Sequence, residues 1–129
     1  MDNLNSILIE GDLVKDPSIA QTPKGTPVCT FCLASRRFFK LGREPQKEVS
    51  VFQVEVWAKL AETCSENLKK GCAVRVLGRL RQCSWFDAEG KNHSRVKIIG
   101  EHVELNPLVC RRGKQAMIAA EKEPQKEKR

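Results

Sequence analysis

Three sites along the chain place large aromatic side chains beside basic residues. An exposed ring can stack on the π-face of any nucleobase, and nearby cations can neutralise the phosphates between stacked bases. This combination is typical of a surface that binds single-stranded nucleic acid. In chain order the sites are Arg36, Arg37, Phe38 and Phe39; Trp57 with Lys59; and Arg79 and Arg81 with Trp85.

The residues around Trp57 predict a strand that ends at this ring. From Val49 to Val56 apolar side chains alternate with others, and a period of two over eight residues indicates a half-buried strand. Phe52, Val54 and Val56 share the face expected to be buried. The alternation puts Trp57 on the opposite, polar face, where a large ring is unusual in a core and available to a ligand.

A helix is expected directly after Trp57. Its apolar stripe recurs at helical spacing, and Lys69, Lys70 and Gly71 are expected at its C-terminal end, where cations and a C-cap glycine suit the macrodipole and the chain reversal. The next strand, residues 73–81, puts Arg79 and Arg81 on its polar face. The stripe consists of Leu60, Ala61, Cys64 and Leu68.

Three more strands are expected, at residues 4–14, 28–35 and 93–105, with glycine bulges or bends at Gly11 and Gly100. The charged segment 36–48 is expected to lose regular structure in its second half, where Gly42 and Pro45 lie. Five strands with one helix between the third and fourth describe an all-β, five-stranded OB-fold barrel. An SH3-like barrel is the competing architecture, but it normally lacks a helix of this length at that position.

Composition narrows the functional classes. The chain has 129 residues and a formal net charge of +7, which suits one folded domain and a polyanionic partner. No apolar run approaches 18 residues, and the N-terminus lacks the basic region of a signal peptide, so we expect a cytoplasmic protein and no membrane partner. No nucleophile–base pair, paired carboxylates or phosphate-binding glycine loop indicates an enzyme, and no cofactor is expected.

The cysteines are predicted to be structural and reduced rather than metal ligands or disulfides. Cys29 and Cys32 form a C-x-x-C pair, but they fall within a predicted strand, where residues three apart point to opposite faces. They could not share a metal or a disulfide without a bend. The other four cysteines supply no second pair, so no metal site is predicted.

Two segments are expected, a barrel at residues 1–106 and a charged tail at residues 107–129. Pro107 ends the last predicted strand, and the tail carries seven basic and three acidic residues. A segment so short and charged cannot build its own core, so we expect it to be mobile and to add phosphate contacts.

Dense, ordered motifs resemble those of the bacterial single-stranded DNA-binding proteins (SSB family). The resemblance spans about residues 3–105. The motifs are Asn5–Gly11, Asp16-Pro17, Thr22–Gly25, the run from Val56 to Leu80 that reads VWAKLAETCSENLKKGCAVRVLGRL, and Trp85 in the hairpin that follows.

The resemblance implies a homotetramer that binds single-stranded DNA in replication, recombination and repair, close to the nucleoid. It implies stacking on Trp57, Trp85 and Phe39, or on Phe38 by a one-residue slip. A fourth family ring falls at Val51, so one platform is missing. Family members usually end in an acidic tip that recruits replication and repair proteins. This sequence ends in Glu-Lys-Arg129, which leaves such partners open.

Two other functions fit the same residues. The domain could bind single-stranded RNA or replication-restart intermediates, because sequence alone gives little discrimination of the 2′-hydroxyl. It could also be an assembly scaffold that has lost DNA binding, although Trp57 and Trp85 argue against this. Under the main hypothesis, phosphates are held by Arg36, Arg37, Lys59, Arg79 and Arg81.

Overall fold

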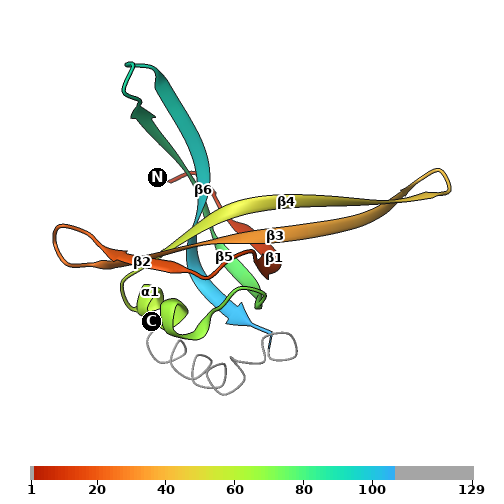
Figure 1. Ribbon diagram of the computed structural model, residues 1–129, viewed down its shortest axis with the longest axis horizontal. Coiled ribbons are helices and arrows are strands. Elements are labelled where there is room, and N and C mark those ends of the chain that lie inside the picture. Colours follow the sequence, from red (N-terminus) through yellow and green to blue (C-terminus); the bar gives the residue numbers. More distant parts are fainter. Residues whose placement is uncertain (1, 107–129) are drawn as a thin grey trace.

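Strand pairing closes one sheet into a barrel in the computed structural model, which describes residues 2–106 (Figure 1). The sheet order is β1-β5-β6-β4-β3-β2, and pairing of Asp12 and Leu13 of β1 with β3 closes it. An all-β barrel with one helix is thereby confirmed; β2 is a strand that the sequence did not predict. The elements are β1 (Ile7–Leu13), β2 (Ser18–Gln21), β3 (Pro27–Leu41), β4 (Glu44–Trp57), α1 (Ala58–Asn67), β5 (Ala73–Phe86) and β6 (Asn92–Leu105).

The barrel core is made by the inward-facing positions of the strands. Phe31 and Leu33 of β3 lie opposite Val54 and Phe52 of β4. The alternation predicted for residues 49–56 is confirmed at Val54 and Val56, which are fully buried, but Phe52 is 40% exposed. The alternation that puts Arg79 and Arg81 on the polar face of residues 73–81 predicts Leu80 on the buried face, but Leu80 is 43% exposed. The pairing of β1 with β5 ends at Ile7 and Gly78, so β1 does not extend alongside Leu80. The largest fully buried side chains are Phe31, Leu13, Leu33, Ile98, Val54, Val56, Val76, Cys29 and Cys72.

The helix α1 packs its predicted stripe onto the barrel, with Ala61, Cys64 and Leu68 buried. The predicted C-terminus was wrong: α1 ends at Asn67, with Leu68 extended and no basic residue in the last turn. Beyond the helix, the backbone N–H of Lys70 donates a hydrogen bond of 2.8 Å to the carboxylate of Asp16, which is distant in the sequence. No helix within residues 2–106 is long and apolar enough to cross a membrane.

Two long hairpin arms project from the barrel, one made of β3 and β4 and one of β5 and β6, beside the shorter hairpin of β2 and β3 (Figure 1). The first arm shows that the expected loss of regular structure in the second half of residues 36–48 was wrong. Gly42, at φ 67°, turns the chain tightly, and the ladder runs unbroken to the pair Leu41–Glu44. Pro45 is tolerated because a two-stranded ribbon leaves alternate N–H groups without a ladder bond.

The bulge expected at Gly100 is present. Leu77 pairs with His102 and Gly78 with Gly100, which leaves Glu101 as the extra residue of β6. A Cβ on Gly78 would lie 2.1 Å from the carbonyl oxygen of Ile99, so this crossing requires glycine. Gly11 shows no register shift; a Cβ there would lie 2.6 Å from the carbonyl oxygen of Ala34, where β3 meets β1.

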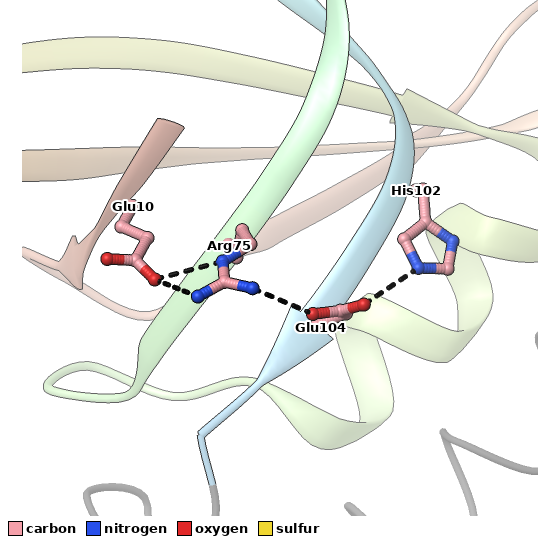
Figure 2. A network of polar contacts seen from close by, with 4 residues as sticks. All are labelled: Glu10, Arg75, His102 and Glu104. Atoms are coloured by element: carbon pink, nitrogen blue, oxygen red, sulfur yellow. Dashed lines mark hydrogen bonds and ion pairs between the residues drawn. The ribbon is translucent and has the colours of Figure 1, made fainter. Parts of the chain in front are cut away.

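A chain of charged side chains crosses β1, β5 and β6 on the barrel exterior (Figure 2). The Arg75 guanidinium donates to Glu10 at 2.6 and 2.9 Å and lies 3.8 Å from Glu104, which contacts His102 at 3.3 Å. These groups are exposed, so the network contributes little stability.

The cysteines follow the prediction in part. Cys29 is buried and Cys32 is partly exposed, as expected for opposite faces of a strand, and burial raises the pKa of the Cys29 thiol to about 11. Free thiols are found at Cys29, Cys32, Cys64 and Cys83. Cys72, however, is disulfide-bonded, which corrects the expectation of reduced cysteines throughout. The predicted tail, residues 107–129, lies outside the described residues.

Candidate nucleic-acid interface

The outward side chains of β4, β5 and β6 form one continuous surface, here called the Trp57–Trp85 face. In the β5–β6 ladder Arg81 lies opposite Lys97, and Trp85 lies opposite His93. Directly opposed residues of a ladder share one side of the sheet. The face comprises Gln53, Glu55 and Trp57 of β4; Arg79, Arg81, Cys83 and Trp85 of β5; and His93, Arg95 and Lys97 of β6.

Trp57 lies at the corner between β4 and α1 and is 39% exposed. The next residue, Ala58, has φ 61°, a left-handed conformation that a residue with a Cβ rarely adopts. This sharp reversal turns strand into helix immediately after the ring. The indole Nε1 donates a hydrogen bond of 2.6 Å to Oε2 of Glu55, two residues earlier on the same face. The ring is therefore anchored by its edge while part of its surface meets solvent.

Trp85 is held by its neighbours across the β5–β6 arm. The His93 ring stacks on it at 5.6 Å between centroids and 22° between planes, and the Arg95 guanidinium carbon lies 5.5 Å from the ring centroid. His93 Nε2 lies 2.7 Å from Oδ2 of Asp87 in the turn. That hydrogen bond, with others from the backbone, lowers the pKa of Asp87. Trp85 keeps 43% of its surface exposed on this supported platform.

Two of the predicted cations on β5 reach the Trp57–Trp85 face. Arg81 lies close enough to Glu55 to lower the pKa of that carboxyl group. Arg79 lies at the edge of the face, 3.6 Å from the Glu101 carboxylate. Lys59 is exposed on the first turn of α1, beside Trp57 in the chain.

Phe38 and Phe39 lie on opposite sides of the β3–β4 arm. Phe38 lies opposite Lys47, and Lys47 faces the same side of β4 as Trp57 because ten residues separate them in the strand. The Phe38 side chain is 71% exposed. Phe39 points to the other side and carries the Arg37 guanidinium 4.8 Å from its centroid. Of the two rings, Phe38 therefore lies on the Trp57 side of the arm.

The two arginines of this arm are engaged by carboxylates. Arg36 donates to Asp12 of β1 and lines a cavity of about 820 Å³ beside that strand, together with Glu10 and Arg75. Arg37 lies 3.8 Å from Glu48 across the ladder. These pairs are exposed and weak, so they do not prevent a phosphate from competing, but the arginines are not gathered beside Trp57.

Sequence reasoning missed the contribution of β6. Arg95 donates to Gln53 at 2.8 Å, and Lys97 Nζ donates to Oε1 of Glu55 at 2.6 Å, so both cations lie beside the tryptophans. The signal was available: in the segment 93–97 the basic residues alternate, which indicates one exposed face. Val51 is 57% exposed on the same side as Trp57. Within residues 2–106 no cluster of His, Cys, Asp and Glu side chains could hold a metal ion.

Glu55 is the one carboxylate on this face, and it is 6% exposed. Burial raises its pKa, but hydrogen bonds from Lys97 and Trp57 and the charges of Lys97 and Arg81 outweigh burial and hold the pKa below the ordinary 4.5. A carboxyl group whose pKa is lowered by folding stabilises the folded state at pH values above its pKa in the unfolded chain. This stabilisation is lost as the pH falls through its pKa in the folded protein.

We therefore expect Glu55→Gln to lower the melting temperature at pH 7 but to have a smaller effect well below pH 4.5, where the wild-type carboxylate is protonated in both states. Thermal unfolding of both proteins followed by circular dichroism from pH 7 to pH 3 measures the difference. A difference in melting temperature that is the same at both ends of this range would contradict the assignment.

A small barrel whose exterior carries partly exposed tryptophans among cations is the arrangement expected of a domain that binds unpaired nucleic acid. Comparison with known proteins identifies the family: the sequence model of the single-strand binding protein family matches residues 4–106. The chain belongs to this family.

Curated relatives agree with the family match. The chain is 42% identical over 121 residues to a single-stranded DNA-binding protein of Aquifex aeolicus, an alignment that covers 93% of this chain and 79% of that protein. It is 39% identical over 107 residues to single-stranded DNA-binding protein 2 of Chlorobaculum tepidum, covering 81% and 72% of the two chains. Both alignments extend over most of each protein, so the similarity is not confined to a short motif.

Proposed function

We propose that the chain binds single-stranded DNA with little sequence preference, as an OB-fold domain acting in replication, recombination and repair. The observation that carries this proposal is the placement of Trp57 and Trp85 on one sheet face together with Arg81 and Arg95. Stacking contributes roughly 1–3 kcal/mol per base and tolerates any sequence, and the cations neutralise intervening phosphates. The names of the relatives favour DNA as the ligand.

The geometry of the face supports one path for the bound DNA. Bases stack on Trp57 and Trp85, and the strand continues along the β3–β4 arm to Phe38. Lys59 and Arg79 lie at the two margins of this path, and Arg36, on the Phe38 side of the arm, is recruited from Asp12. Arg37 shares the reverse side of the arm with Phe39 and is a weaker candidate for a phosphate contact. Phe39, on the reverse side of the arm, is the weaker candidate for stacking. The role is binding rather than catalysis, in the cytoplasm and at the nucleoid.

We further infer that the barrel assembles with copies of itself, as a homotetramer. Beyond the end of the core, inward-facing apolar side chains stay exposed: Phe52 is 40%, Leu80 43% and Val96 58% exposed. In addition, β1 pairs with β3 only at Asp12 and Leu13, so the edge of residues 7–11 facing β3 lacks a ladder partner within the described residues. Apolar surface and an open strand edge both favour association.

The direct test of the function is competition between ligands. A fluorescently labelled dT oligonucleotide is bound to the full chain at low salt, and unlabelled dT, rU or duplex DNA of equal length is added while anisotropy is followed. We expect dT to displace the probe at the lowest concentration and duplex DNA at the highest. Displacement by rU at lower concentrations than dT would assign the site to RNA, and no binding of the probe would overturn the proposal.

A further inference from the structure

The Glu55 carboxylate occupies an unexpected place, because it lies at the centre of a surface built for a polyanion. Its side chain is 8% exposed, and each of its oxygens has one donor. Trp57 Nε1 donates to Oε2 and Lys97 Nζ donates to Oε1, both at 2.6 Å. Such short charge-assisted hydrogen bonds are roughly twice as strong as neutral ones.

The first consequence concerns the orientation of Trp57. An indole has a single donor, and here that donor is committed to Glu55 on the same strand. The ring is therefore held by its edge before any base arrives. A preformed platform costs less conformational entropy on binding than a side chain that must be ordered by the ligand.

The second consequence concerns charge. The Lys97 side chain is 19% exposed, and its ammonium group is neutralised by Glu55 in the free protein. A phosphate placed beside Trp57 would meet the carboxylate as well as the lysine. Arg81 and Arg95 form no ion pair in the described part of the chain, so phosphates find them more favourable.

We propose that Glu55 is a positioning residue of the interface: its carboxylate anchors Trp57 as a stacking platform and, by neutralising Lys97, keeps phosphates out of the space beside that ring. The bound strand thus presents a base to Trp57 and carries its phosphates past Arg81 and Arg95. This inference rests on the proposed binding of single-stranded DNA. Glu55 is the residue that decides where bases and where phosphates lie along the face.

The test separates the two roles of the carboxylate. Glu55→Gln removes the charge and keeps an oxygen that accepts from the indole, whereas Glu55→Leu removes both. The variants are made in a Trp85→Phe background, so that Trp57 is the single tryptophan of the chain. Acrylamide quenching of Trp57 is measured without DNA, and binding of a labelled dT oligonucleotide is measured at several salt concentrations.

For Glu55→Gln we expect unchanged acrylamide quenching and tighter binding. We also expect the salt slope, meaning the slope of the logarithm of the binding constant against the logarithm of the salt concentration, to be steeper by about 0.7, because Lys97 gains a phosphate contact. For Glu55→Leu we expect stronger acrylamide quenching and binding about two- to tenfold weaker than for Glu55→Gln, the effect of one lost hydrogen bond. Equal behaviour of the two variants, or affinity and slope equal to those of the parent in both, would overturn the proposal.

A second variant guards against misfolding caused by an unpaired buried charge. Glu55→Gln with Lys97→Met removes both charges together and is expected to fold. Its affinity and salt slope should equal those of the parent, because the Glu55–Lys97 pair presents no net charge to the DNA. A salt slope reduced by about 0.7 would show that Lys97 already contacts a phosphate, and it would refute the proposal. If the Trp85→Phe parent and the wild-type chain both fail to bind dT, the proposed function itself fails, and the role of Glu55 falls with it.

Discussion

Replacing Trp57 and Trp85 together by alanine is expected to weaken binding of a dT oligonucleotide by roughly 2–6 kcal/mol, since each ring stacks one base at roughly 1–3 kcal/mol. In affinity this is a loss of about 30-fold or more. Both rings are only partly exposed, at 39% and 43%, but neither belongs to the barrel core, so the fold should persist. Anisotropy of a labelled oligonucleotide measures the affinity, and circular dichroism checks the fold.

The matched control is Phe86→Ala. Phe86 follows Trp85 directly in β5 and is 72% exposed, but the alternation of the strand turns it to the opposite side of the arm. Removing it takes away a ring of comparable size from the same hairpin without touching the Trp57–Trp85 face. We expect its affinity to match that of the wild type. A loss as large as that of the double variant would mean that the strand does not follow this face.

The second large effect is on folding. Phe31→Ala is expected to lower the free energy of unfolding by about 3–5 kcal/mol, because it deletes a ring that is 1% exposed at the centre of the barrel. Urea unfolding followed by far-ultraviolet circular dichroism measures the change.

Phe38→Ala on the same strand is the comparison. Its ring is 71% exposed on the β3–β4 arm, so we expect a change in unfolding free energy within about 0.5 kcal/mol and weaker DNA binding. Comparable destabilisation by the two substitutions would show that Phe38 packs into the core and is not available to a base.

Within the barrel, local patterns predicted the main core strands, the helix and most of the side chains that these elements bury. A period of two buries Val54 and Val56 and turns Trp57 outward, and a helical stripe buries Ala61 and Cys64, because each element has one side that must leave water. These patterns are local, and they hold wherever a single core lies behind the element.

Beyond the barrel, local patterns failed. Leu80 has the spacing of a core residue but lies where no second layer covers β5. Gly42 and Pro45 have the composition of a loop but lie in a tight turn and on a two-stranded ribbon that accepts a proline. The helix ends before the predicted lysines, and the backbone N–H of Lys70 is bound instead by Asp16, 54 residues away in the chain. No pattern within a short window reports such a contact.

The site shows the same division. Trp57 and Trp85 were recognisable as rings on polar faces, which is a local property. The pairing of Lys97 with Glu55 joins residues 42 positions apart, and that of Arg36 with Asp12 joins residues 24 positions apart. Register between distant strands decides which cations stay available and which are neutralised, and the sequence alone does not specify it.

The central claim is that single-stranded DNA stacks on both tryptophans, and intrinsic fluorescence tests it most directly. Trp57→Phe and Trp85→Phe each leave one tryptophan, because the chain has two. Titration of either variant with oligo-dT at low salt should quench the remaining tryptophan, with a midpoint that matches binding of the labelled oligonucleotide. Oligonucleotide binding that leaves both tryptophans unquenched would contradict the claim.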